Sequence, residues 1–262
     1  SRRVYRDTAH YVAEKRAVLD SADPTAWSDE QQERLEASLA RQRAEDAGRG
    51  DFFFFHGCGS PGLSVLYEEI GLEQFSYLLA DAPDIVDELL EFRTVQVVNH
   101  LKHYPEDHGV LGVFMGDDIA FRSGPLFGPA WMRVHYFPRL ARICNALHAK
   151  GIRLLFHSDG DLNPILDDLV EAGIDGLNPI EVLANMDVAE IHRRHPHLFM
   201  AGGIDVSQLL PFGTAEQVKD AVKRAIHDAE GRIMIGSTTE LHNDVPLENF
   251  LAMRDAVLAN PY

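Results

Sequence analysis

Short apolar runs that end in polar or glycine-containing clusters recur along the chain after Gly50, and an amphipathic stretch follows each of them. Apolar runs of this length are typical of buried strands, whereas amphipathic stretches are typical of surface helices. The pattern therefore predicts alternating strands and helices over residues 51–262. The six predicted strands are DFFFFHGCG (51–59), VLGVFMGDD (110–118), IRLLFHSDGD (152–161), IDGLNPIE (174–181), LFMAGGID (198–205) and RIMIGSTTE (232–240).

Capping residues mark the boundaries of the predicted helices. In TAEQVKDAVKRAIHDAEG, Thr214 and Gln217 stand at the two positions of a capping box. In DLNPILDDLVEAG, Asn163 is a candidate N-cap and Gly173 ends the helix. The first 50 residues are polar and helix-like, with Ser28 as a further cap, so we expect an N-terminal helical segment over residues 1–50.

Strand–helix alternation requires right-handed crossovers between parallel strands, so a doubly wound open sheet and a (β/α)8 barrel are the candidate folds. No G-x-G-x-x-G sequence follows the first predicted strand, and polar residues stand at the end of every strand. We therefore expect an α/β fold with a (β/α)8 TIM barrel as the single catalytic domain over residues 51–262. Six strands are two fewer than a barrel has, and the chain begins with serine, so we expect N-terminal strands to be missing from it.

The charge balance narrows the class of partners. The chain has 24 Lys and Arg against 41 Asp and Glu, a formal net charge of −17. This charge disfavours nucleic acid and anionic membrane surfaces, so we expect a small-molecule substrate instead. The chain has only two cysteines, too few for a disulfide framework, which favours a cytoplasmic location. The sequence contains no run of 18 apolar residues, so we predict no membrane span.

The polar residues at the strand ends are the candidate site, because barrel enzymes place their chemistry where parallel strands end. His157 closes an apolar run and Asp159 follows two positions later, so both side chains can point to the same side of an extended strand end. We predict four catalytic residues, His157, Asp159, Asp118 and Glu240. The predicted substrate-binding residues are Asp117, Arg122, His56, Asn178, Glu181, Asp205 and His242.

Several acidic residues at the strand ends have a competing interpretation. Adjacent ionised aspartates repel, so one of Asp117 and Asp118 should have a raised pKa unless a cation such as Arg122 lies nearby. An acid after a strand is also typical of turns and helix caps. That structural role is the alternative for Asp161, Asp205 and Asp244.

Five segments are distinctive in combination: GLEQFSYLLADAPDIVDELL (71–90), GDDIAFRSGPLFGPAWM (116–132), FHSDGDLNPILDDLVEAGIDGLNPIE (156–181), AGGIDVSQLLPFGTAEQVKDAV (201–222) and DVPLENFLAM (244–253). Together they resemble the uroporphyrinogen decarboxylase superfamily over residues 51–260. Members of that superfamily have a (β/α)8 barrel and are longer at the N-terminus. One branch decarboxylates uroporphyrinogen in porphyrin (haem) biosynthesis, and another moves methyl groups to or from a corrinoid on a partner protein.

Differences from each branch favour methyl transfer from an ether. The N-terminal motifs of the decarboxylases have no counterpart here, and Thr239 stands where they have a histidine. The thiol-methylating enzymes hold zinc with His-x-Cys and a later cysteine, whereas this chain has His157, Ser158, Asp159 and Thr239 at those places. The HSDG and GGIDV sequences are similar to those of O-demethylase-type methyltransferases.

The resemblance therefore implies a corrinoid-dependent methyltransferase that moves a methyl group from a small methoxylated substrate to the cobalamin of a partner protein. It implies no covalently bound cofactor, and it implies a homodimer. The departing oxygen gains negative charge, so His157, Asp159 and Glu240 are candidates for donating a proton or for holding a metal ion such as zinc. A uroporphyrinogen decarboxylase-like carboxy-lyase and a degenerate ligand-binding barrel are the alternatives.

Overall fold

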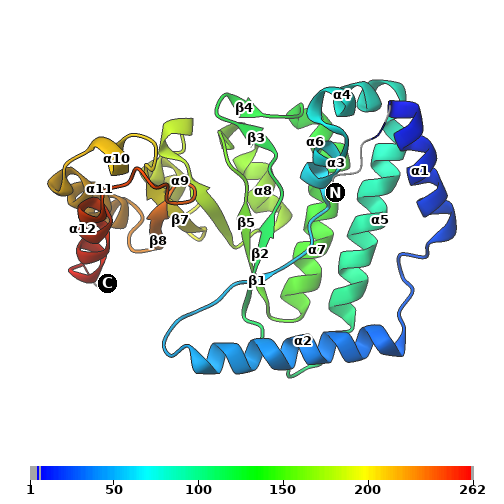
Figure 1. Cartoon of the computed structure of the whole chain (residues 1–262), viewed down its shortest axis with the longest axis horizontal. Coiled ribbons are helices and arrows are strands. Elements are labelled where there is room, and N and C mark those ends of the chain that lie inside the picture. Colours follow the sequence, from blue (N-terminus) through cyan, green and yellow to red (C-terminus); the bar gives the residue numbers. More distant parts are fainter. Residues whose placement is uncertain (1–4, 6, 261–262) are drawn as a thin grey trace. The chain divides into compact units, whose positions relative to one another are not determined.

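The computed structural model describes Tyr5 and residues 7–260. The chain divides into two compact units (Figure 1). The first comprises Ser1–Asp117 and Ala130–Leu154, and the second comprises Asp118–Pro129 and Leu155–Tyr262. Residue 50 lies inside the first unit, because the N-terminal helices pack with later elements of that unit. The predicted domain boundary at residue 50 stays a prediction.

The first unit is mainly helical. Strands β1 (His56–Gly57) and β2 (Gly112–Gly116) pair in parallel, with His56 opposite Val113. Packing of α5 against α1, α4 and α7 forms its core, in which Tyr11, Phe75 and Tyr136 are fully buried. The helices are α1 (Thr8–Ser21), α2 (Asp29–Gly48), α3 (Leu63–Ile70), α4 (Leu72–Asp81), α5 (Pro83–Lys102), α6 (Pro129–His135) and α7 (Phe137–Ala149).

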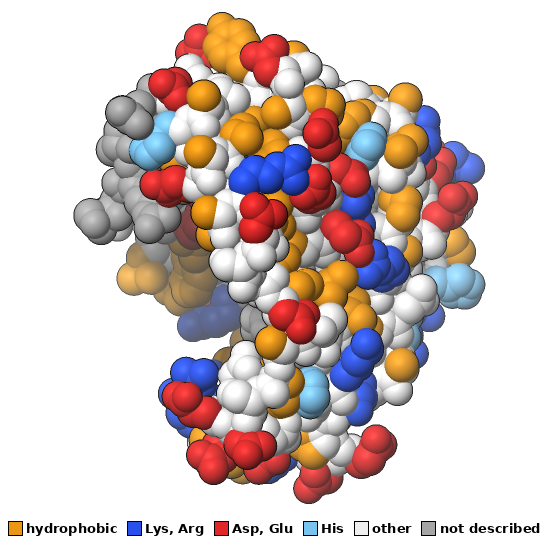
Figure 2. All heavy atoms as spheres, turned by 90° about the vertical axis from the view of Figure 1, so that its right-hand side faces the viewer, with side chains coloured by type: hydrophobic (Ala, Val, Ile, Leu, Met, Phe, Trp, Pro, Cys, Tyr) orange, Lys and Arg blue, Asp and Glu red, His pale blue; other side chains and the backbone are white. Residues whose placement is uncertain are grey.

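Helices α1 and α2 lie in the described part of the N-terminal segment, and its surface is polar. Ser28 and Gln31 form the capping box that begins α2, from which only Leu35 and Leu39 are buried. On the face that carries α1 and α5, acidic, basic and hydrophobic side chains are interspersed (Figure 2). Among the described residues, no helix has both the length and the apolarity that crossing a membrane requires.

The second unit is built on parallel strands. Its sheet has the order β5 (Arg153–His157), β6 (Gly176–Ile180), β7 (Phe199–Ile204) and β8 (Ile233–Ser237). The short strands β3 (Ala120–Phe121) and β4 (Gly124–Pro125) form an antiparallel pair. Between and after the sheet strands lie η1 (Asn163–Ile165), α8 (Leu166–Ala172), η2 (Val182–Ala184), α9 (Val188–Arg194), α10 (Leu209–Phe212), α11 (Ala215–Asp228) and α12 (Leu247–Leu258).

Each of the six predicted apolar runs contains a strand of the structure, so the predicted alternation is confirmed. The strand in the first run is short, because Phe52 and Phe53 are 74% and 55% exposed and only His56 and Gly57 pair with β2. Asn163 was expected as an N-cap, and this is wrong. Its side chain instead donates to Asp161 Oδ1 and to the Asn185 carbonyl, and the helical segment begins with the 3₁₀ helix η1 before α8.

The capping box that begins α11 is expected to contribute to the stability of the chain. Thr214 Oγ1 accepts a hydrogen bond from the Gln217 amide, and the Gln217 side chain accepts from the Thr214 amide. Thr214→Ala leaves the Gln217 amide without this acceptor, so we expect the free energy of unfolding to fall by about 1 kcal/mol in urea titrations. Thr214→Ser keeps the hydroxyl and is the control, and equal stability of the two variants would contradict the cap's contribution.

Candidate functional site

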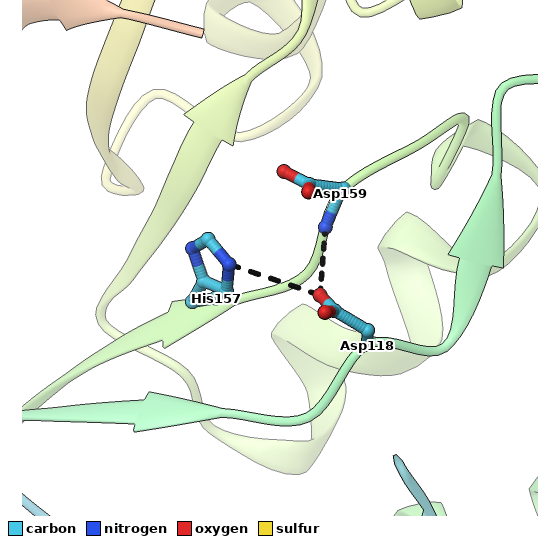
Figure 3. Close-up of side chains that lie close together, drawn as sticks. All are labelled: Asp118, His157 and Asp159. Atoms are coloured by element: carbon cyan, nitrogen blue, oxygen red, sulfur yellow. Dashed lines mark hydrogen bonds and ion pairs between the residues drawn. The ribbon is translucent and has the colours of Figure 1, made fainter. Parts of the chain in front are cut away.

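Three predicted catalytic residues meet in the second unit. Each of Asp118, His157 and Asp159 offers one metal-ligating atom, and these atoms all lie within 4.8 Å of one another (Figure 3). Asp118 precedes β3, His157 is the last residue of β5, and Asp159 follows in the loop. We call these three residues the acid–histidine cluster.

His157 is positioned by the neighbouring strand. Parallel pairing places His157 opposite Asn178, and His157 Nδ1 lies 2.7 Å from Asn178 Oδ1. An amide oxygen can only accept a hydrogen bond, so Nδ1 carries the proton in the neutral ring and Nε2 carries the lone pair. Nε2 lies 3.7 Å from Asp118 Oδ1. The ring therefore presents a ligand or base atom to the cluster, and it presents a proton donor when it is protonated.

Asp118 and the adjacent Ile119 each form a hydrogen bond with the loop that follows β5. The Asp159 amide donates to Asp118 Oδ1 at 3.2 Å. The fully buried Ser158 accepts a hydrogen bond from the Ile119 amide at 3.0 Å and donates to the Asp159 carbonyl at 3.0 Å. Ser158 thus connects the backbones that carry the two acids. Ser158 was not among the predicted site residues, although a hydroxyl inside an apolar strand end is the kind of residue that needs a specific partner.

Gly160 allows the loop to turn closely against β3. Its φ is +97°, and a Cβ at this position would lie 2.6 Å from the Phe121 carbonyl oxygen, so a side chain has neither the conformation nor the space. The Gly160 amide donates to Glu181 Oε2 at 2.8 Å. Glu181, predicted to bind substrate, therefore holds this loop in the structure.

Asp159 contains a buried acceptor without a hydrogen bond. Its Oδ1 atom has no hydrogen-bond partner among the described residues. Burial raises the pKa of Asp159, His157 opposes this effect, and the charges of Asp118, Glu181 and Glu240 raise the pKa further. A buried carboxylate oxygen with no donor is expected to take up a proton or a cation.

The raised pKa of Asp159 has a defined consequence for stability. The folded chain binds this proton more tightly than the unfolded chain, so stability is lost as pH rises above the unfolded pKa and is retained at lower pH. We expect Asp159→Asn to raise the melting temperature at pH 7 and to leave it nearly unchanged at pH 3, measured by circular dichroism after EDTA treatment. A lower melting temperature for the variant at pH 7 would contradict this assignment.

Glu240 lies near the cluster and is exposed. The Thr239 hydroxyl donates to Glu240 Oε2 at 2.7 Å, and this bond lowers the pKa of Glu240, with smaller contributions from His242 and His157. The predicted metal-binding set was His157, Asp159 and Glu240. The geometry instead groups Asp118 with the first two, and Glu240 acts on Asp159 through its charge. His242 is exposed in the same loop.

Two other predicted residues of the second unit make structural contacts. Asp205 accepts hydrogen bonds from the amides of Ser207, Gln208 and Leu209 at 2.7–3.0 Å, which is the capping role given as its alternative. Arg122 Nε donates to the Leu183 carbonyl at 2.9 Å. Their roles in substrate binding remain predictions.

The remaining two candidates belong to the first unit. His56 Nε2 lies 3.0 Å from Asp46 Oδ2. Asp117 is 1% exposed and accepts hydrogen bonds from the amides at the start of α3 and from the Tyr136 hydroxyl. Burial raises the pKa of Tyr136, and the Asp117 charge adds to this effect. Asp117 therefore stabilises a helix end, and its predicted role in substrate binding is untested.

The cluster can support two kinds of chemistry. Two carboxylates and one imidazole form a hard donor set that suits Zn²⁺ or a similar divalent cation, and the unpartnered Asp159 oxygen fits such a ligand. The same groups can also hold and donate a proton, because Asp159 has a raised pKa and His157 faces Asp118.

Comparisons with known proteins identify the family. Residues 23–259 match the family model described as uroporphyrinogen decarboxylase (URO-D). A solved structure described as a methyltransferase from Methanosarcina mazei is similar, with a TM-score of 0.65 and 20% sequence identity. The match covers 85% of this chain and 62% of that one, and no curated protein matches significantly.

These likenesses agree with the architecture. The alternating helices and parallel strands are those of a (β/α)8 barrel-like α/β fold, as the strand pattern predicted. The family model covers most of both units. The chain belongs to the uroporphyrinogen decarboxylase family.

Proposed function

We propose that this chain is a methyltransferase that takes a methyl group from a small methoxylated compound and passes it to the corrinoid of a partner protein. The observation that carries the proposal is the acid–histidine cluster, which brings oxygen and nitrogen donors together and includes a buried Asp159 oxygen without a hydrogen-bond partner among the described residues. Family membership supports an enzyme, and the similar methyltransferase structure is consistent with methyl transfer.

Methyl transfer from an ether requires the protein to stabilise the departing oxygen. When a methyl group leaves an ether, the oxygen that remains gains negative charge and must be stabilised. His157 can meet this demand as a proton donor, because Asn178 orients its ring and its Nε2 lies 3.7 Å from Asp118 Oδ1. The corrinoid, as the second substrate, supplies the nucleophile that accepts the methyl group.

A divalent cation is the alternative source of that stabilisation. Asp118, His157 and Asp159 would hold it, and when bound it would act as a Lewis acid on the ether oxygen. The three residues offer no thiolate, so activation of a thiol by a zinc–thiolate site is disfavoured. The donor set therefore favours an oxygen-containing substrate.

Electrostatics disfavour the carboxy-lyase alternative. Uroporphyrinogen is a polyanion, and the groups around His157 include Asp118, Asp159 and Glu240 in a chain of net charge −17. Like charges repel at such short range, so a polyanionic substrate would need cations around the cluster. Arg122, the cation predicted for the site, donates from Nε to the Leu183 carbonyl.

Methyl transfer can be measured directly. The chain is incubated with reduced corrinoid and a panel of methoxylated aromatic and aliphatic compounds, and formation of methyl–cobalt is followed by absorbance. We expect at least one ether to methylate cobalt and no carbon dioxide release from uroporphyrinogen. Failure of every donor, together with release of carbon dioxide, would replace the proposal with the carboxy-lyase.

A further inference from the structure

The first unit contains a pocket of about 450 Å³ between the start of α2, the C-terminal half of α5 and the end of β1. A second pocket of about 330 Å³ runs along α2 and shares Trp27, Gln31, Gly57, His100 and Tyr104 with the first. We call the three ring-bearing residues among them, Trp27, His100 and Tyr104, the aromatic wall. The acid–histidine cluster lies in the other unit and contributes nothing to this pocket.

The aromatic wall is held in place by its own contacts. The Trp27 ring stacks on His103 with centroids 4.1 Å apart, and its Nε1 donates to Gln32 Oε1 at 3.0 Å. The His100 ring lies 5.5 Å from both the Trp27 and the Tyr104 rings. Three ring systems therefore line the pocket in a supported arrangement, which favours a ligand that interacts with ring faces and edges.

The charges around the pocket favour a cation. Among the described residues that line the first pocket, none is Lys or Arg, and Asp23 is the acidic one. Hydrogen bonds from Thr25 lower the pKa of Asp23, so its carboxylate is ionised at neutral pH. Burial lowers the pKa of His100 and raises that of Cys58 to about 12, so both are neutral. The described lining of the first pocket thus presents negative charge and aromatic rings, and Arg34 lines only the second pocket.

We propose that this pocket is a second small-molecule site, which binds an organic cation of the methylated-amine class. Aromatic rings attract a quaternary ammonium group through their electron-rich faces, and a carboxylate at the rim adds to the attraction. The pocket volume is sufficient for a small ligand of this kind. This site goes beyond the proposed methyl transfer and does not depend on it.

Tryptophan fluorescence offers a sharp test, because the chain has two tryptophans and Trp131→Phe leaves Trp27 as the reporter. The Trp131→Phe protein is titrated with choline, with its uncharged analogue 3,3-dimethylbutanol and with the anion 3,3-dimethylbutyrate. We expect saturable binding of choline, affinity at least about tenfold lower for the uncharged analogue, and no binding of the anion. Absence of a saturable change with choline, or equal affinity for choline and the alcohol, would overturn the proposal.

Variants in the same background locate the site. Tyr104→Leu is expected to weaken choline binding by about fivefold and Asp23→Asn by about threefold. Tyr77→Leu is the control, because Tyr77 is 52% exposed on α4 and does not line the pocket. Asp23 is exposed, so Asp23→Asn decides the question if Tyr104→Leu fails to fold by circular dichroism. Unchanged choline affinity in Asp23→Asn would then contradict the proposed site.

Discussion

Replacing His157 by glutamine is expected to lower the rate of methyl transfer by about 10²- to 10⁴-fold, the range for loss of a positioned acid–base group. Glutamine keeps a polar side chain but cannot hold a proton near neutral pH or supply an imidazole lone pair. The chain folds with His157 at a strand end, so the variant should retain its circular dichroism spectrum. The measurement is the initial rate of methyl–cobalt formation under saturating donor.

Two further variants make this result specific. His227→Gln is the matched control, because the His227 side chain is 88% exposed on α11 and lies outside the cluster, and it should keep the wild-type rate. Asn178→Ala should lower the rate less than His157→Gln, because it removes the partner of Nδ1 but leaves the imidazole. A normal rate in His157→Gln would remove His157 from the mechanism and the proposed reaction centre with it.

Zinc titration by calorimetry separates the two roles of the cluster. If the three residues hold a cation, wild-type protein should bind one equivalent of Zn²⁺, and both Asp118→Asn and His157→Gln should weaken that binding by at least about tenfold. If His157 acts as a proton donor, EDTA-treated protein should retain its rate. A rate that survives EDTA without measurable zinc binding would exclude the Lewis-acid role.

Replacing Asp117 by alanine is expected to lower the free energy of unfolding by about 3–5 kcal/mol, a large part of the 5–15 kcal/mol typical of a domain. The carboxylate is buried and satisfies three backbone amides at the start of α3 and the Tyr136 hydroxyl. Alanine leaves all four donors buried without an acceptor. Urea unfolding followed by circular dichroism measures the effect.

A conservative variant and a surface variant serve as controls for Asp117→Ala. Asp117→Asn keeps one acceptor oxygen and should cost less than Asp117→Ala, because part of the hydrogen bonding survives. Asp107→Ala is the control in the same unit, because Asp107 is exposed, and it should change stability by no more than about 0.5 kcal/mol. Equal unfolding free energies for Asp117→Ala and Asp107→Ala would show that the cap contributes little.

The paired aspartates illustrate the limit of sequence reasoning at this site. Asp117 and Asp118 are adjacent and chemically identical, and their sequence positions predicted roles for both in the site. In the structure Asp117 caps α3 in the first unit, whereas Asp118 joins His157 and Asp159 in the second. Within the acid–histidine cluster the pKa of Asp159 is raised, and burial of its side chain has the largest effect.

Residues that support the cluster were harder to predict than those that form it. His157 and Asp159 stand out at the end of an apolar run, so their sequence positions alone made them candidates. Asn178 was predicted as a substrate-binding residue, but parallel register places it against His157 Nδ1. Glu181 was predicted in the same way, and it accepts from the Gly160 amide. Such contacts depend on which strands are neighbours and in which register.

The sequence by itself determined the order of helices and strands, the capping boxes of α2 and α11, and the candidacy of His157 and Asp159. These features follow from hydrophobic periodicity and from hydrogen bonds between residues three or four apart, so short stretches of chain are sufficient to encode them. Only the tertiary structure decided that Asp118 rather than Glu240 completes the acid–histidine cluster, and that Asp117 and Asp205 cap helices. These contacts depend on strand register and loop path, which bring together atoms that lie far apart in the chain. Burial then sets the free energy of ionising each side chain.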